Sequence, residues 1–144
     1  MGEAMPERIR TLYSDYIETA VLLEKNRKFG QGMFGIGKSP ADNPCHESFV
    51  NDLAALLKEY ARETPPSDEL RSVLEWIYRA PIEHQRPQSM HWILVAAHGT
   101  TLELIPLLDA ADAEALRGQY ARDYRRWERL PVQKQVLSAL EKRI

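Results

Sequence analysis

Apolar positions recur at helical spacing along most of the chain. In residues 6–28 they fall three and four places apart, at Ile9, Leu12, Tyr16 and Ala20. Such spacing puts them on one face of a helix, since a helix turns once every 3.6 residues. The pattern predicts a first helix with one buried stripe.

Four more amphipathic stretches follow, and each opens on a residue suited to a helix start. Helices are expected to begin at Pro44, Ser67 and Pro131, and one more is expected to be capped by Asp109 or Asp112. Proline fits the first turn, and serine, asparagine and aspartate are favoured caps. No segment alternates between apolar and polar residues as a half-buried strand does. The sequence therefore predicts an all-α fold.

The ends of the middle helices are predicted from helix breakers. Pro81 is expected to close the third helix, because proline disfavours helical backbone at the residue before it. A central helix that is apolar all round is expected to begin at Pro87 and to end at Gly99 in the left-handed conformation. A short helix over residues 102–108 is expected next.

Helices that open with proline recur at Pro44, Pro87 and Pro131, at intervals of 43 and 44 residues. This interval resembles that of HEAT and armadillo repeats, in which antiparallel helix pairs stack side by side. We therefore expect one domain over residues 1–144, a compact stack of about six to seven helices in antiparallel hairpins. An irregular helical bundle is the alternative.

The composition is that of a globular protein. The chain has 144 residues, 44% hydrophobic and 28% charged, which is typical of a globular domain. One cysteine suits a reducing compartment, the N-terminus lacks a secretory pattern, and the longest uncharged run, residues 87–102, is shorter than a membrane span. We expect a cytoplasmic protein without a membrane segment.

A glycine-rich loop is expected at residues 29–43, between the first two helices. It contains Gly32-x-x-x-x-Gly37-Lys38-Ser39, the spelling of a phosphate-binding P-loop. A helix rather than a strand precedes it, and Pro40 makes Ser39 a poor helix start. A true P-loop is therefore disfavoured. Binding of an anion by Gly37, Lys38 and Ser39 is kept as an alternative interpretation.

Cys45 and His46 lie at the expected start of the second helix. A helix N-terminus lowers the pKa of a thiol, so Cys45 is a candidate nucleophile if the protein is an enzyme. His46 is a second candidate catalytic residue, although adjacent residues of a helix point in different directions. A metal site is not expected: His91 and His98 would lie about 10.5 Å apart along one helix, too far for one zinc ion. No cofactor is expected either.

Charge is unevenly distributed although the net charge is only −2. Residues 44–116 carry a net −7 and residues 117–144 a net +5. Basic and aromatic residues alternate in residues 117–134, which suggests single-stranded nucleic acid. The acidic balance and the buried-stripe spacing of Tyr120 and Tyr124 favour a protein contact instead. The candidate interaction surface comprises Arg122, Arg125, Arg126, Trp127 and Arg129.

These observations favour a non-catalytic helical interaction module, which binds a protein partner or another copy of itself. A small enzyme or anion binder centred on the loop, and a nucleic acid binder, are the alternatives.

Overall fold

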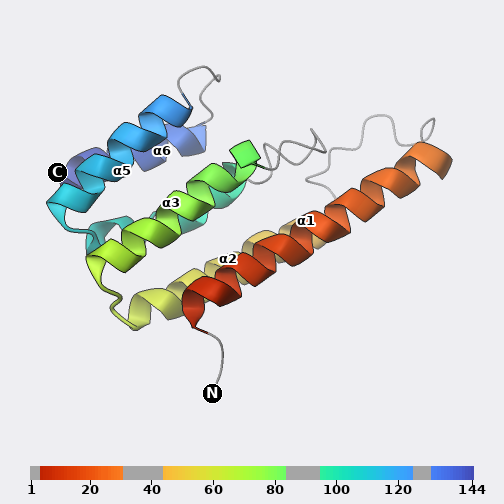
Figure 1. The fold of residues 1–144 in the computed structure, drawn as a ribbon, viewed down its shortest axis with the longest axis horizontal. Coiled ribbons are helices and arrows are strands. Elements are labelled where there is room, and N and C mark those ends of the chain that lie inside the picture. The colour runs from red at the N-terminus through yellow and green to blue at the C-terminus, as the bar shows by residue number, and fades with distance from the viewer. Residues whose placement is uncertain (1–3, 31–43, 84–94, 125–130) are drawn as a thin grey trace.

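A computed structural model shows the fold (Figure 1). It describes the backbone of residues 4–30, 44–83, 95–124 and 131–144, and the side chains of residues 4–19, 47–82, 95–124 and 131–144. Every described element is helical, which confirms the all-α class. The elements are α1 (Met5–Gly30), α2 (Pro44–Arg62), α3 (Ser67–Glu83), the 3-10 helices η3 (Ala97–Thr101) and η4 (Ile105–Leu107), α5 (Ala110–Asp123) and α6 (Pro131–Arg143).

Helices α1 and α2 lie antiparallel. Tyr16 stacks on Phe49 with ring centroids 4.1 Å apart, whereas Arg8, a little over two turns earlier in α1, reaches Glu59 in the last part of α2. The two chain segments connect through residues 31–43, which lie outside the described part of the chain. α1 and α2 form one side of the molecule (Figure 1).

Helices α3 and α5 run in the same direction, side by side. Ser67 and Asp112, both in first turns, hydrogen-bond to each other, and Arg79 pairs with Asp123 near the opposite ends. α6 folds back antiparallel on α5, and η3 packs between α2 and α6. Helices α1, α3 and α5 all point the same way in Figure 1.

The core runs without interruption from α1 to α6. It is rich in phenol rings: all six tyrosines of the chain are buried. They are Tyr13, Tyr16, Tyr60, Tyr78, Tyr120 and Tyr124. Tyr13 meets Phe49 and Trp76 edge-on, with ring centroids 5.0 Å away in both cases. Edge-to-face contacts of this kind suit the charge distribution of aromatic rings.

The starts of α2, α3 and α6 confirm the predictions from Pro44, Ser67 and Pro131. The end of α3 differs from the prediction, because the helix continues through Pro81 to Glu83. Pro81 is buried, and it lies in the last turn, where a proline removes a single backbone hydrogen bond. The prediction that Pro81 closes the helix is therefore wrong.

Gly99 also differs from its prediction. It lies inside η3 and does not adopt the left-handed conformation. A Cβ at this position would meet Val132 Cγ2 at 3.3 Å, so glycine here permits close approach of η3 to α6. The expected helix over residues 102–108 is shorter than predicted: turns lead into η4, which includes Pro106. Most of the helix expected from Pro87 lies outside the described residues.

Candidate interaction surface

The contact between α3 and α5 is lined by a row of polar pairs, which we call the α3–α5 seam. At its beginning, Ser67 Oγ donates to Asp112 and accepts from the Asp109 backbone amide at 2.8 Å. Arg71 Nη1 also reaches Asp112, at 3.2 Å. These bonds satisfy groups at two adjacent helix N-termini, where carboxylates are favoured by the helix dipole.

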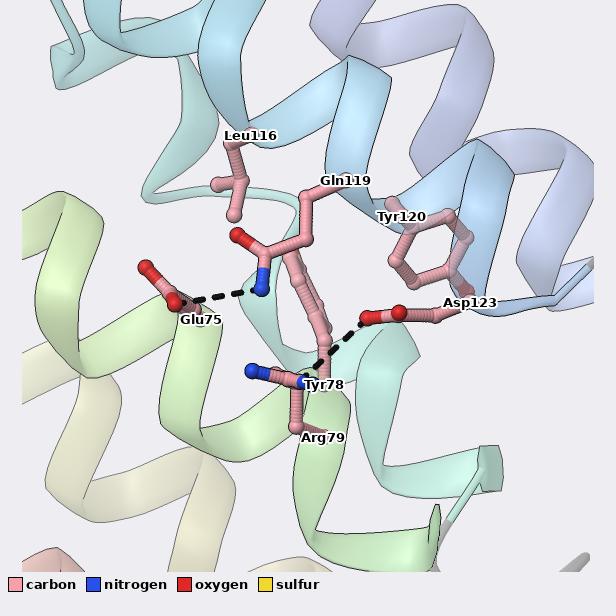
Figure 2. Close-up of a pocket in the computed structure, with 7 residues that line it drawn as sticks. All are labelled: Glu75, Tyr78, Arg79, Leu116, Gln119, Tyr120 and Asp123. Carbon is pink, nitrogen blue, oxygen red and sulfur yellow. Dashed lines mark hydrogen bonds and ion pairs between the residues drawn. The ribbon is translucent and has the colours of Figure 1, made fainter.

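The seam continues with two further pairs (Figure 2). Gln119 Nε2 donates to Glu75 Oε1 at 3.1 Å, and Arg79 Nε lies 3.5 Å from Asp123 Oδ2. A small cleft opens over these pairs, but it has no room for a water-sized group. These polar side chains pair with one another, so the cleft is part of the contact between two helices and is not a ligand cavity.

A buried polar network lies beneath the seam. Thr101 Oγ1 donates to the His98 carbonyl and therefore accepts the Tyr78 hydroxyl proton, both at 2.6 Å. Tyr124 donates to the Tyr78 carbonyl, and His98 Nδ1 lies 2.9 Å from the Tyr120 hydroxyl. The His98 ring meets those of Tyr78, Tyr120 and Tyr124 at steep angles. The network connects α3 with η3 and with the C-terminal end of α5.

Burial controls the ionisation of this core. It raises the pKa of Tyr78 well above the ordinary tyrosine value. Burial also raises the pKa of Tyr124, and the nearby Asp123 carboxylate adds to it. The pKa of Tyr13 is raised by burial first, and then by Tyr124 and Tyr78. These phenols therefore act as neutral structural groups.

A second surface feature runs along the solvent side of α6, which we call the α6 groove. It is a shallow depression, wide open to solvent, with a volume of about 470 Å³. Its lining comes from α6 and from the turn after η3: Leu102, Lys134, Gln135, Ser138, Ala139 and Lys142. Leu102 and Ala139 are half-buried and form the apolar floor, whereas the other four side chains are exposed. Neither lysine forms an ion pair with any described residue.

The α6 groove was not predicted from the sequence. Residues 134, 138 and 142 recur every four positions on the polar side of the last helix, which is ordinary for a solvated face. The groove needs Leu102 as part of its floor, and that residue is more than 30 positions away from the nearest lining residue of α6 in the sequence. Only the packing of α6 against η3 and η4 brings the two segments together.

The predicted anion site at Gly37, Lys38 and Ser39 lies outside the described residues. Cys45 and His46 lie in the first turn of α2, as predicted, although their side chains are among those not described. Both alternatives therefore remain predictions. Within the described residues, no group of three or more potential metal ligands comes together.

The predicted basic surface is described in part. Arg122 is exposed near the end of α5, and Arg125, Arg126, Trp127 and Arg129 lie outside the described residues. Tyr120 and Tyr124 are buried, as their spacing predicted, so neither ring can stack on a nucleic acid base. His98 is buried in the core, with its Nδ1 2.9 Å from the Tyr120 hydroxyl, whereas His91 lies outside the described residues.

Comparisons with known protein families, with curated proteins and with solved structures find no match to this chain. Among the described helices, none combines the length and the apolar composition that a bilayer crossing requires.

Proposed function

We propose that this protein is a helical interaction module, and that the α6 groove is its contact surface for a protein partner. The groove supports this function because it combines an apolar floor with two lysines that have no described charge partner. Apolar centres with polar rims are typical of protein contact surfaces. In the α3–α5 seam, by contrast, the polar side chains already pair with one another.

We further propose that the helices form a HEAT-like stack of hairpins. Support comes from the common direction of α1, α3 and α5 and from the antiparallel pairs α1–α2 and α5–α6. The contacts of η3 with both α2 and α6 fit a second layer that the helix expected from Pro87 would complete. In such stacks the grooves between neighbouring helices of one layer are extended binding surfaces.

Site-specific photocrosslinking tests the function. A photoreactive phenylalanine analogue would replace Ser138 in the α6 groove or, as a matched control, Ser14 on the exposed side of α1. We expect a specific protein crosslink from position 138 and none from position 14. The crosslinked protein, once purified, should bind the wild-type chain and lose binding to a Ser138→Arg variant.

Equal crosslinking from the two positions would contradict the proposal. So would a purified partner that binds the Ser138→Arg variant as well as the wild type, since arginine at this exposed position fills the groove without touching the core. Light scattering of the chain alone separates self-association from binding of a different protein.

A further inference from the structure

The geometry points to an acidic amphipathic helix, belonging to another protein, as the occupant of the α6 groove. This inference rests on the proposed function, which assigns the groove as a contact surface, and adds the chemistry of the partner. Recognition of a helix by an apolar groove is a recurring mode of protein binding, in which side chains at helical spacing act as anchors.

The floor of the groove fits a helix because its central side chains are small. Ala139 in the floor and the exposed Ser138 beside it lie midway along the groove, and Leu102 is the larger apolar side chain of the floor. Small side chains at a helix contact allow the two axes to approach to about 8 Å. An apolar side chain of the partner would rest between Ala139 and Leu102.

The rim selects for negative charge. Lys134 and Lys142 stand on either side of Ser138, eight residues apart on α6. At 1.5 Å per residue their backbone positions are about 12 Å apart along the axis. A partner helix lying along α6 would match them with carboxylates seven or eight residues apart on one edge of its apolar stripe. Both lysines can form ion pairs with these carboxylates, because neither forms an ion pair with any described residue of the chain.

A second copy of this chain fits the groove less well. Two α6 grooves brought together would oppose like charges, since Lys134 and Lys142 line the groove and no carboxylate does. The acidic residues 44–116 of a second copy lie outside α6 and several have partners within the chain, so they could meet the groove only in a head-to-tail contact, which gives rings or filaments and not a closed dimer. Those with partners include Glu59, Glu69, Glu75 and Asp112. Charge complementarity therefore favours a separate acidic protein.

Selection from a phage-displayed library of 18-residue helices, with the sequence of one face randomised, tests the inference without assuming a partner. We expect the full-length protein to enrich helices with an apolar stripe and carboxylates seven or eight residues apart. The best peptide, labelled with fluorescein, should bind in a fluorescence anisotropy titration. Affinity should fall about tenfold or more when Lys134→Glu and Lys142→Glu are combined, and it should weaken as salt screens the rim charges.

Lys58→Glu is the matched control, because Lys58 is an exposed lysine on α2 that does not line the groove. It should leave affinity within about twofold, and circular dichroism should show all variants folded. Enrichment of neutral or basic helices, no enrichment at all, or equal loss with Lys58→Glu would overturn the inference. The inference would also be overturned if the wild type formed dimers that the double variant did not form, because a second copy of the chain would then occupy the groove.

The two proposals fail separately. If a partner crosslinks from position 138 but the library selects no acidic helix, the groove is a contact surface for a different chemistry. If neither experiment gives binding, the proposed function itself is wrong.

Discussion

Tyr13 carries a buried hydroxyl for which the structure provides no hydrogen-bond partner among the described residues. Removing water from such a group costs free energy that a hydrogen bond normally offsets. Tyr13→Phe removes the hydroxyl and retains the ring contacts with Phe49 and Trp76. The free energy of unfolding should stay the same or rise by up to about 1 kcal/mol. Urea denaturation checks this expectation.

Tyr78→Phe is the matched control, since the Tyr78 hydroxyl donates to Thr101 in the same core. Its loss should lower the free energy of unfolding by about 1 kcal/mol. A clear destabilisation by Tyr13→Phe, equal to that of Tyr78→Phe, would mean that the Tyr13 hydroxyl has a partner after all.

The buried phenols also predict a pH dependence. In the folded protein Tyr13, Tyr78 and Tyr124 have pKa values raised above the ordinary value of about 10. Between the unfolded and the folded pKa, the unfolded state has lost protons that the folded state still holds, so stability falls as pH rises. The stabilisation is complete below about pH 10 and is lost progressively above it.

Absorbance at 295 nm and circular dichroism, recorded together from pH 8 to 13, measure this effect. Tyrosinate absorbance should appear as helical signal disappears. Full tyrosine ionisation near pH 10 with unchanged helical signal would contradict the buried positions.

At the scale of elements, the α3–α5 seam is expected to stabilise the contact between its two helices. Asp112 accepts bonds from Ser67 and Arg71, and its side chain is 17% exposed. Asp112→Ala removes both bonds and a carboxylate from the first turn of α5. The free energy of unfolding should fall by about 1–2 kcal/mol.

Glu59→Gln is the control for this comparison. It breaks the ion pair between α1 and α2, where Arg8 and Glu59 are 41% and 54% exposed. Solvent screens such a pair, so the change should stay within about 0.5 kcal/mol. Equal losses in the two variants, measured by urea denaturation, would show that the seam contributes no more than an exposed pair.

Helix starts were predictable because they depend on local residues. Pro44, Ser67 and Pro131 each suit the first turn of a helix, and the structure begins α2, α3 and α6 there. The place of Pro81 within α3 and the conformation of Gly99 were not predictable from neighbouring residues, because they depend on tertiary packing. Pro81 is tolerated in the last turn of α3. Glycine at position 99 permits the close approach of Val132 from α6.

At the scale of the whole molecule, the continuous core bears on the prediction of a single domain. Buried side chains from α1 to α6 belong to one cluster, so the helices are expected to unfold together. Thermal unfolding followed by helical circular dichroism and by tryptophan fluorescence should give one coincident transition. Two separated transitions would instead indicate two units.

The α6 groove was not predicted from the sequence, because none of the residues of the predicted interaction surface, Arg122 to Arg129, lines it. The positive charge of the C-terminal residues indicated an interaction surface, and the buried spacing of Tyr120 and Tyr124 disfavoured nucleic acid. The groove itself depends on Leu102 meeting Ala139, a contact made by folding between distant segments. No local pattern in the sequence marks such a contact.

Burial of all six tyrosines has a practical consequence. Tetranitromethane modifies phenol rings that it can reach, and in the folded protein all six rings are covered by other side chains. Nitration can then proceed only when the helices separate for a moment. The rate of labelling would report how often this core opens, with no engineered probe.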